Sequence, residues 1–199
     1  MRTPRVLLIT DPSYPDDTVL RVVAPAARAL PPGTFAVQLR DKERPDRAAW
    51  ASRLRMVTRE LGVPLLVNGD ASLARAVGAE GVHFPSDASD SAIEEARDLW
   101  RSVAAHDDAA VTRARGLGVD AVLVSPIYAT PGKGPARGTD ALSRAVVLAG
   151  GELAVIALGG VSVSNVAQCA EAGADGVAVI RALLEASRPE EVARVLKRS

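Results

Sequence analysis

The chain has 199 residues, of which 48% are hydrophobic and 24% are charged, and its 24 basic side chains balance its 24 acidic ones. Aromatic residues make up only 3% and the formal net charge is zero, so the composition offers neither base-stacking platforms nor a basic surface, and we expect no nucleic-acid partner. The first apolar run is too short for a signal peptide and no segment is long enough to span a bilayer, which predicts a cytoplasmic protein without a membrane partner.

Strand and helix patterns alternate along the whole chain. Apolar runs typical of strands occupy residues 5–10, 35–40, 63–67, 81–84, 102–105, 121–124, 154–158 and 176–180. Helical patterns are expected at 16–30, from Pro45 to 61, at 72–77, 92–99 and 107–117, in a stretch that ends at 148, between the last two strands, and at 189–197. Proline at a first helical position and glycine after a last one mark several of these boundaries.

Eight strands alternating with about eight helices predict an α/β fold, a parallel sheet with helices packed on it. Three segments share one order of helix end, glycine, small residue, acid and strand: ARAVGAEGVHF (74–84), ARGLGVDAVLV (114–124) and AEAGADGVAVI (170–180). Such internal repetition favours closure of the sheet into a single (β/α)8 TIM barrel. An open, doubly wound sheet with one switch point is the alternative. No linker divides the chain, so one barrel domain is expected over residues 1–199.

The active site of a parallel barrel lies at the carboxyl ends of its strands, so the polar residues at those ends are the candidates. They are Gln38, Arg40, Lys42, Asn68, His83, His106, Ser125, Thr130, Lys133, Gly159 and Gly160. Alternation along the second strand places Gln38 and Arg40 on one side of the sheet. Together with Lys42 and Lys133, Arg40 is expected to bind an anion such as a diphosphate at one rim; a solvated strand end is the other interpretation.

Gly159 and Gly160 follow a buried strand, and the strand at 176–180 comes one helix later. The ends of two neighbouring parallel strands, each followed by a helix N-terminus, direct backbone N–H groups toward one point and predict a phosphate site. Tight-turn glycines without a ligand explain the pair equally well. The long loop at 125–138, which contains Thr130, Lys133 and Arg137, is expected to close over phosphate groups as a lid.

The two histidines occupy different kinds of position. His106 follows a strand end and precedes an acidic helix start, where an imidazole can exchange a proton with a ligand; a histidine that only fills the helix start is the other interpretation. His83 is a weaker candidate, because the sequence GVHF can place its side chain inward as part of the packing. Neither has the neighbouring cysteines or carboxylates that a zinc site needs, and Cys169 reads as a small buried residue of a helix.

Several segments together indicate a family resemblance. The matching blocks are VQLRDK (37–42), LLVNG (65–69), GVHF (81–84), the His106 position, SPIYATPGKG (125–134), VIALGGVSVSNV (155–166) and AGADGVAVI (172–180). Over nearly its whole length the chain resembles the superfamily of thiamine phosphate synthases and TenI-type thiazole tautomerases, which are small (β/α) barrels.

The resemblance implies two small-molecule partners and a set of binding residues for each. Those implied to hold the phosphate of a thiazole phosphate are Gly159, Gly160, Val179, Ile180 and Arg181. Those implied to surround the part of the pocket where synthases place a pyrimidine diphosphate are Gln38, Arg40, Lys42, Asn68, Thr130 and Lys133. Pairing of subunits through the barrel helices, which would give a homo-oligomer, is left open by the sequence pattern.

Departures from the superfamily pattern bear on the reaction. Synthases hold Mg²⁺ with two aspartates, and here Asp70 and Asp87 each lie one residue from the expected positions; near-octahedral Mg²⁺ tolerates such a slip poorly. His106 aligns with the histidine that tautomerases use to move a proton. These points favour a metal-independent TenI-type tautomerase, with His106 as proton shuttle and no cofactor, over a synthase with Mg²⁺ held by Asp70 and Asp87.

Other positions leave further alternatives. Ala104 replaces a serine two residues before the histidine, and Arg181 stands where a phosphate-binding serine is usual. Gln38, Arg40 and Lys42, by contrast, are intact synthase features. A barrel that binds a phosphorylated ligand without catalysing a reaction is the third hypothesis.

Overall fold

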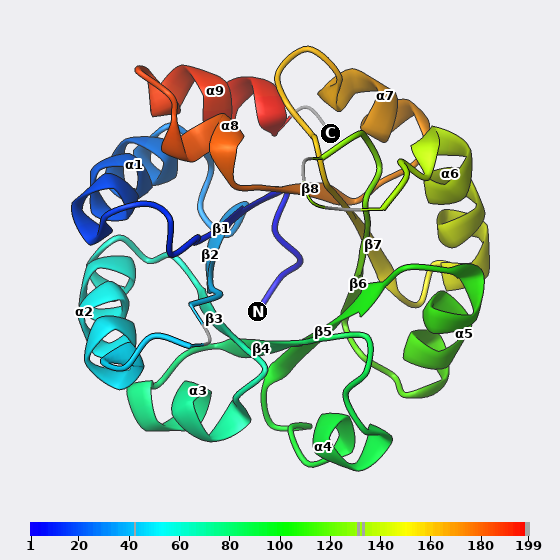
Figure 1. The fold of residues 1–199 in the computed structure, drawn as a ribbon, viewed down its shortest axis with the longest axis horizontal. Coiled ribbons are helices and arrows are strands. Elements are labelled where there is room, and N and C mark those ends of the chain that lie inside the picture. Colours follow the sequence, from blue (N-terminus) through cyan, green and yellow to red (C-terminus); the bar gives the residue numbers. More distant parts are fainter. Residues whose placement is uncertain (42, 131, 133, 198–199) are drawn as a thin grey trace.

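In the computed structural model, eight strands form one closed parallel barrel (Figure 1). Each strand pairs with its neighbours in the sequence, and β8 pairs with β1, which excludes the open doubly wound sheet. The strands are β1 (Val6–Ile9), β2 (Phe35–Leu39), β3 (Leu65–Asn68), β4 (Gly81–Phe84), β5 (Trp100–Ala105), β6 (Ala121–Val124), β7 (Ala154–Leu158) and β8 (Gly176–Val179). The structure describes residues 1–41, 43–130, 132 and 134–197.

Helices surround the barrel wall (Figure 1). They are α1 (Asp16–Arg28), α2 (Arg47–Glu60), α3 (Ala71–Val77), α4 (Asp90–Glu94), α5 (Asp108–Gly116), α6 (Gly138–Ala149), α7 (Val166–Glu171), α8 (Arg181–Leu184) and α9 (Pro189–Leu196). The last helix, α9, packs beside α1, so the end of the chain covers the place where β8 meets β1. No helix in the described ranges is both long and apolar enough to cross a membrane.

Alternate residues of each strand face opposite sides of the barrel wall. The interior cluster consists of Leu7, Ile9, Ala36, Leu66, Trp100, Ala121, Leu123, Ile156 and Ala178. Gln38 pairs in register with Ile9 and Leu66, both members of this cluster, and is only 1% exposed. Its side chain therefore lies on the inner side of the wall, as the alternation predicts. The outward-facing residues pack under the helices in a second, larger apolar cluster.

The three repeated segments form the same hydrogen-bonded corner. In each corner an acid lies just before the second strand of a pair, and its carboxylate accepts the N–H of a residue at the start of the first strand. Glu80 accepts from Leu65 at 2.9 Å, Asp120 from Arg101 at 2.7 Å, and Asp175 from Val155 at 2.8 Å. Each acid also donates its own N–H to the carbonyl of that same residue. The acid in the repeat therefore joins β3 to β4, β5 to β6 and β7 to β8 at the amino ends of the strands.

Several predicted boundaries differ from the observed ones by one to five residues, and the structure shows the cause for two of the helices. Pro45 is expected to open a helix, but a turn closed by the Arg47 N–H to Arg44 carbonyl bond of 3.2 Å comes first, and α2 begins at Arg47. The helix expected at 92–99 begins earlier, because Ser89 accepts the Ala92 N–H and caps α4. It also ends at Glu94, since Trp100 already pairs with Gly81 of β4 and the chain must turn before it.

Candidate functional site

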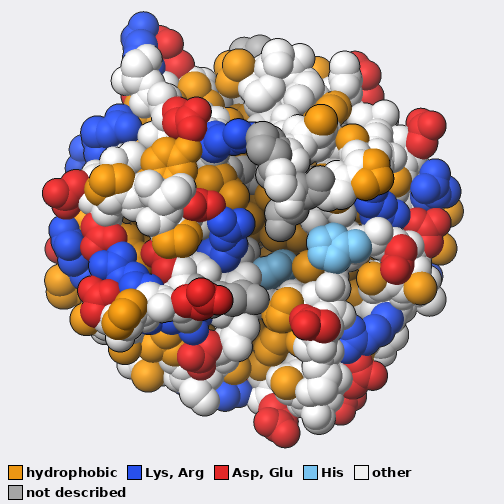
Figure 2. Space-filling model, viewed as in Figure 1, with side chains coloured by type: hydrophobic (Ala, Val, Ile, Leu, Met, Phe, Trp, Pro, Cys, Tyr) orange, Lys and Arg blue, Asp and Glu red, His pale blue; other side chains and the backbone are white. Residues whose placement is uncertain are grey.

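A pocket of about 830 Å³ opens at the carboxyl ends of the strands. Its lining comes from most strand ends of the barrel, from the loop at 125–138 and from α8. Figure 2 shows this face, with the histidine side chains in pale blue beside the central hollow and a blue cationic side chain across from them. The volume is in the range of small-molecule sites, and the mouth of a barrel is where such sites occur in this fold.

Glycines allow one wall of the pocket to form. Gly159 has a φ of 98° and Gly160 a φ of 66°, both in the left-handed region. A Cβ at Gly159 would lie 2.8 Å from Pro126 Cα, and one at Gly160 would lie 2.7 Å from Tyr128 Cβ. The loop after β6 therefore packs directly on the turn after β7. Both glycines form a tight turn and also line the pocket, so the two interpretations are compatible, and binding of a ligand here stays a prediction.

The end of β8 completes that wall. Val179, Ile180 and Arg181 line the pocket beside the two glycines, and α8, a single turn of helix, begins there. Arg181 is exposed and reaches the outer edge of the pocket. Glu185, one turn later, is the one carboxylate among the described lining residues, and it accepts a hydrogen bond from the Tyr14 hydroxyl. That bond is the main cause that raises the pKa of Tyr14.

Both histidines line the pocket, and each is held through Nδ1. His106 is exposed, and its Nδ1 lies 3.0 Å from the carbonyl oxygen of Ser125, a geometry in which Nδ1 carries the proton and Nε2 is free to accept one. His83 is only 5% exposed, with Nδ1 2.9 Å from the Ser102 hydroxyl. His83 is thus buried, and it also lines the pocket, where the candidate list at the strand ends places it.

Arginines give the pocket most of its charge. Arg40, Arg137 and Arg181 all line it. Arg40 is paired with Asp11 of the β1 to α1 loop, while Arg137, from the start of α6, contacts Asp108 of α5. Although burial opposes the shift, hydrogen bonds from Ser13 and the charge of Arg40 lower the pKa of Asp11. The described lining is therefore suited to an anion rather than to a cation.

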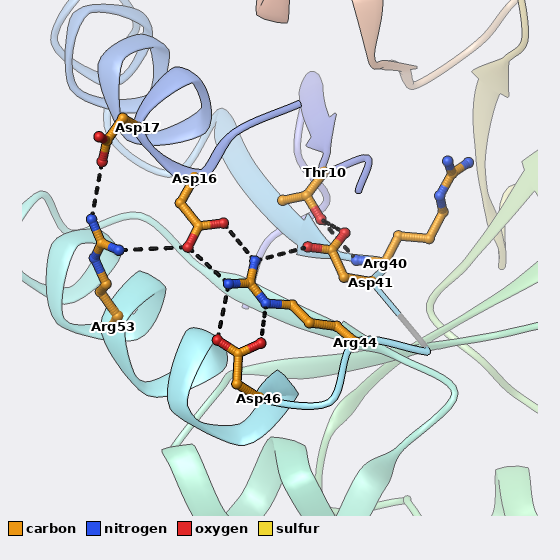
Figure 3. A network of polar contacts seen from close by, with 8 residues as sticks. All are labelled: Thr10, Asp16, Asp17, Arg40, Asp41, Arg44, Asp46 and Arg53. Carbon is orange, nitrogen blue, oxygen red and sulfur yellow. Dashed lines mark hydrogen bonds and ion pairs between the residues drawn. The ribbon is translucent and has the colours of Figure 1, made fainter. Parts of the chain in front are cut away.

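A polar network lies behind Arg40 (Figure 3). The Arg40 backbone N–H donates to Thr10 Oγ1 at 3.0 Å, and Thr10 donates to the carboxylate of Asp41 at 2.9 Å. Thr10 and Asp41 are both buried. Arg44 extends the network toward solvent, with both of its terminal nitrogens on Asp16 and its guanidinium 5.2 Å from the centre of the Trp50 ring. The network holds the backbone at Arg40 while its side chain extends toward the pocket.

The remaining predicted residues fall into three groups. Asn68 and Thr130 line the pocket, and Asn68 Oδ1 is buried without a hydrogen-bond partner in the part of the chain that is described. Gln38 is buried below the pocket and does not line it. Lys42 and Lys133 lie outside the described residues.

Neither of the two aspartates proposed for Mg²⁺ lies in the pocket lining. Asp70 caps α3, accepting the Leu73 N–H at 2.8 Å, and its other oxygen lies 3.4 Å from Arg47. Asp87 is exposed, and neither aspartate lines the pocket. Across the described ranges, no group of three histidine, cysteine or acidic side chains is arranged to hold a metal ion. Because Asp70 is engaged with Leu73 and Arg47 and neither aspartate lines the pocket, the pair does not present the carboxylates that Mg²⁺ would need there.

Comparison with known proteins identifies the family. Residues 6–183 match the family described as thiamine monophosphate synthase (TMP-TENI). The chain belongs to this family. A thiamine-phosphate synthase from Roseiflexus castenholzii is 40% identical over 181 residues, covering 84% of this chain and 76% of that protein. One from Bacillus velezensis is 33% identical over 183 residues, covering 86% and 81%.

A solved structure agrees with the sequence match. The thiamine phosphate pyrophosphorylase from Pyrococcus furiosus superposes with a TM-score of 0.82 at 25% identity, over 98% of this chain and 94% of that one. The expected superfamily and the barrel fold are both confirmed. Within the thiamine monophosphate synthase family, these relatives carry the name of the synthase branch, whereas the departures at Asp70 and Asp87 led us to expect the tautomerase branch. The preference for a tautomerase thus finds no specific support in the relatives.

Proposed function

We propose that the chain is a thiamine-phosphate synthase, which joins a pyrimidine diphosphate to a thiazole phosphate. The observation that carries the proposal is the 33–40% identity to proteins of that name along most of the chain. A pocket of about 830 Å³ with a glycine wall at one side and arginines at its rim supports it. Two phosphorylated substrates need two places for anions, and the pocket offers both.

The reaction is a substitution at the methylene carbon of the pyrimidine. The bond from that carbon to the diphosphate oxygen breaks, the thiazole ring nitrogen forms a new bond to the carbon, and diphosphate leaves with the electron pair. Carbon–oxygen cleavage is favoured when the negative charge that develops on the leaving group is neutralised. Charges fixed in the buried part of the pocket wall act more strongly than they would in water.

The pocket supplies these charges from two sides. The thiazole phosphate is placed against Gly159, Gly160, Val179, Ile180 and Arg181, since the loops after the last two strands and the short helix that follows are the usual phosphate site of this fold. The diphosphate is placed toward Arg40, with Asn68 and Thr130 as polar neighbours. Gln38, Lys42 and Lys133 remain expected members of this second group.

A tautomerase is the second candidate, and two observations favour it. The described residues do not provide a carboxylate pair for Mg²⁺ in the pocket, and a tautomerase needs none. His106 is exposed at the mouth, with Nδ1 held by Ser125 and Nε2 available to take a proton from a ring carbon and return it elsewhere on the ring. In this reaction His106 is the catalytic residue, and the arginines only bind the substrate.

One experiment separates these reactions. The purified protein is incubated with both substrates, with Mg²⁺ or with EDTA, and thiamine phosphate and diphosphate are followed by chromatography and ³¹P NMR. Formation of both products in equal amounts is the expected result. In parallel, the non-aromatic thiazole carboxylate phosphate is supplied alone, and wild type is compared with His106→Asn.

The outcomes are distinct. Aromatisation that His106→Asn abolishes, without any thiamine phosphate, would establish the tautomerase and reject the synthase. Calorimetric binding of thiazole phosphate without turnover in either assay would reject both enzymes and leave a ligand-binding barrel. Dependence of the synthase reaction on Mg²⁺ would show that a metal enters with the diphosphate, since the described carboxylates do not form a site for it.

A further inference from the structure

Arg137 differs from the other charged residues at the pocket because its hydrogen bonding is incomplete. It lines the pocket, and its side chain is 16% exposed. Nη2 contacts Asp108 at 3.3 Å, but Nη1 is buried and has no hydrogen-bond partner in the described structure. A buried guanidinium nitrogen without an acceptor costs free energy, and an acceptor brought by a ligand would remove that cost.

The backbone around Arg137 is fixed. Its N–H donates to the carbonyl of Pro126 at 2.8 Å, and the next N–H, of Gly138, donates to Ile127 at 3.0 Å. The carbonyl of Ser125, which precedes this segment, holds His106. Arg137 and His106 are therefore attached to the same short segment at the mouth of the pocket, and the guanidinium is held in place by a backbone that is already ordered.

Arg144 provides a natural comparison. It contacts the other oxygen of Asp108, also at 3.3 Å, so the two arginines share one carboxylate. Arg144 is 57% exposed and does not line the pocket. One carboxylate cannot neutralise two guanidinium groups, so Asp108 leaves positive charge in excess at this position. The excess lies beside the pocket at Arg137 and in solvent at Arg144.

The charge balance of the pocket points the same way. Its described lining contains three arginines and one carboxylate, Glu185, which already accepts the Tyr14 hydroxyl. Of the three arginines, Arg40 is paired with Asp11, and Arg137 shares Asp108 with Arg144. A phosphate-type anion that enters this space meets guanidinium groups. The described lining has no cluster of carboxylates that would repel the anion unless a divalent cation were bound between the two.

We propose that Arg137 binds an oxyanion of the substrate beside His106, and that this binding does not require a divalent cation. The inference rests on the proposed function, in which that oxyanion is the diphosphate. A guanidinium forms two parallel hydrogen bonds to two oxygens of a phosphate group. Arg137 thereby supplies positive charge that a metal ion would otherwise supply. Asp70 and Asp87, which would have to hold that metal, do not line the pocket.

The test measures binding rather than turnover, with inorganic pyrophosphate as the probe and isothermal titration calorimetry as the readout. Wild type is titrated in EDTA and again with Mg²⁺. Arg137→Gln removes the charge, Arg137→Lys keeps the charge but not the two-pronged geometry, and Arg144→Gln is the matched control on the same carboxylate. Circular dichroism and thermal unfolding confirm that each variant is folded.

We expect wild type to bind pyrophosphate in EDTA, and Arg137→Gln to bind it about 10- to 100-fold more weakly, the range for a charge-assisted hydrogen bond. Arg137→Lys should recover part of the loss, and Arg144→Gln should change binding less than about twofold. Equal losses in Arg137→Gln and Arg144→Gln would overturn the proposal, as would binding that appears only with Mg²⁺, or no binding by wild type.

Titrations with inorganic phosphate and acetate distinguish the class of anion. Selective weakening of phosphate and pyrophosphate, with acetate unaffected, supports a phosphate-type ligand, whereas selective weakening of acetate contradicts it. The result is independent of the reaction. Pyrophosphate binding that depends on Arg137, in a protein that makes no thiamine phosphate, would overturn the proposed synthase and leave this inference standing. Synthase activity with pyrophosphate binding that does not depend on Arg137 would overturn this inference and leave the proposed synthase standing.

Discussion

At the scale of single residues, Arg40 and Asp11 form an ion pair at the rim of the pocket. Their side chains are 33% and 22% exposed, and two hydrogen bonds from Ser13 also reach Asp11. The pKa of Asp11 lies below its ordinary value of 3.8 despite partial burial. A lowered pKa in the folded state means that Asp11 stabilises the fold above about pH 4 and loses this contribution as the pH falls through the folded pKa.

Arg40→Gln should therefore raise the pKa of Asp11 toward its ordinary value without reaching it, because the Ser13 bonds remain. The cost at neutral pH should be small, about 0.5 kcal/mol, as for other partly exposed pairs. Titration of the Asp11 carboxyl by ¹³C NMR without substrate measures the shift. Arg53→Gln, which pairs with Asp16 and Asp17 instead, is the control and should leave the Asp11 titration unchanged. An unchanged pKa in Arg40→Gln would contradict the assignment.

At the scale of elements, the loop after β6 and the turn after β7 form one packed unit. The Tyr128 hydroxyl oxygen lies 3.1 Å from the carbonyl oxygen of Asn165 and 3.0 Å from Oε1 of Gln168 in α7, and its one proton can be donated to either, so the loop is fixed to the next helix as well. Burial raises the pKa of Tyr128, which keeps this hydroxyl protonated as a donor. The glycine wall of the pocket depends on the close approach of this loop to Gly159 and Gly160, where there is no room for a Cβ.

Gly160→Ala tests the packing directly, with Gly118→Ala as the matched control. Both glycines have positive φ, 66° and 59°, but a Cβ at Gly118 would meet nothing within 4 Å. We expect Gly118→Ala to lower the free energy of unfolding by about 1 kcal/mol, the cost of the backbone conformation alone. Gly160→Ala should lose about 3 kcal/mol or more, since the overlap with Tyr128 adds to it. Urea unfolding measures both, and equal losses would show that the close contact is relieved without cost.

The sequence predicts elements better than the contacts between loops. The double glycine marks the end of β7 because a left-handed backbone there is available mainly to glycine. The sequence does not show which residue presses on these glycines, since Pro126 and Tyr128 are more than thirty positions away. Asp70 illustrates the same limit: counting from the family pattern makes it a metal ligand, but its position before α3 makes it a helix cap. Arg137 was recognised only as part of a long loop, because its orphaned nitrogen depends on packing.

At the scale of the whole molecule, the repeat in the sequence and the repeat in the barrel have one physical basis. Alternating apolar strands and helices predicted the fold, since local periodicity decides which residues face inward and which face outward. The acid of each repeated segment adds a specific link between neighbouring strands. The first pair has no such acid: at β1 and β2 the carbonyl of Thr34 receives the N–H groups of Arg5 and Val6 instead. Of the eight neighbouring strand pairs, three are therefore joined through the carboxylate of a repeated acid, whereas β1 and β2 are joined there through a backbone carbonyl.

The links should contribute to stability independently, because each acid serves a different strand pair. Removing the carboxylate in Asp120→Ala or Asp175→Ala takes the acceptor from one backbone N–H, and we expect each variant to lose about 1 kcal/mol, at the lower end for a charged acceptor because both acids are exposed. Asn at either position keeps an acceptor and should lose less. The double alanine variant should lose the sum of the two, about 2 kcal/mol, since the sites share no partner. Chemical unfolding of all variants, with Asp87→Ala as an exposed control expected to stay within about 0.5 kcal/mol of wild type, makes the comparison. A double variant no less stable than either single variant would contradict this additivity. It would mean that loss of one corner already removes the stabilisation from the other, so that the corners act cooperatively in the closed sheet.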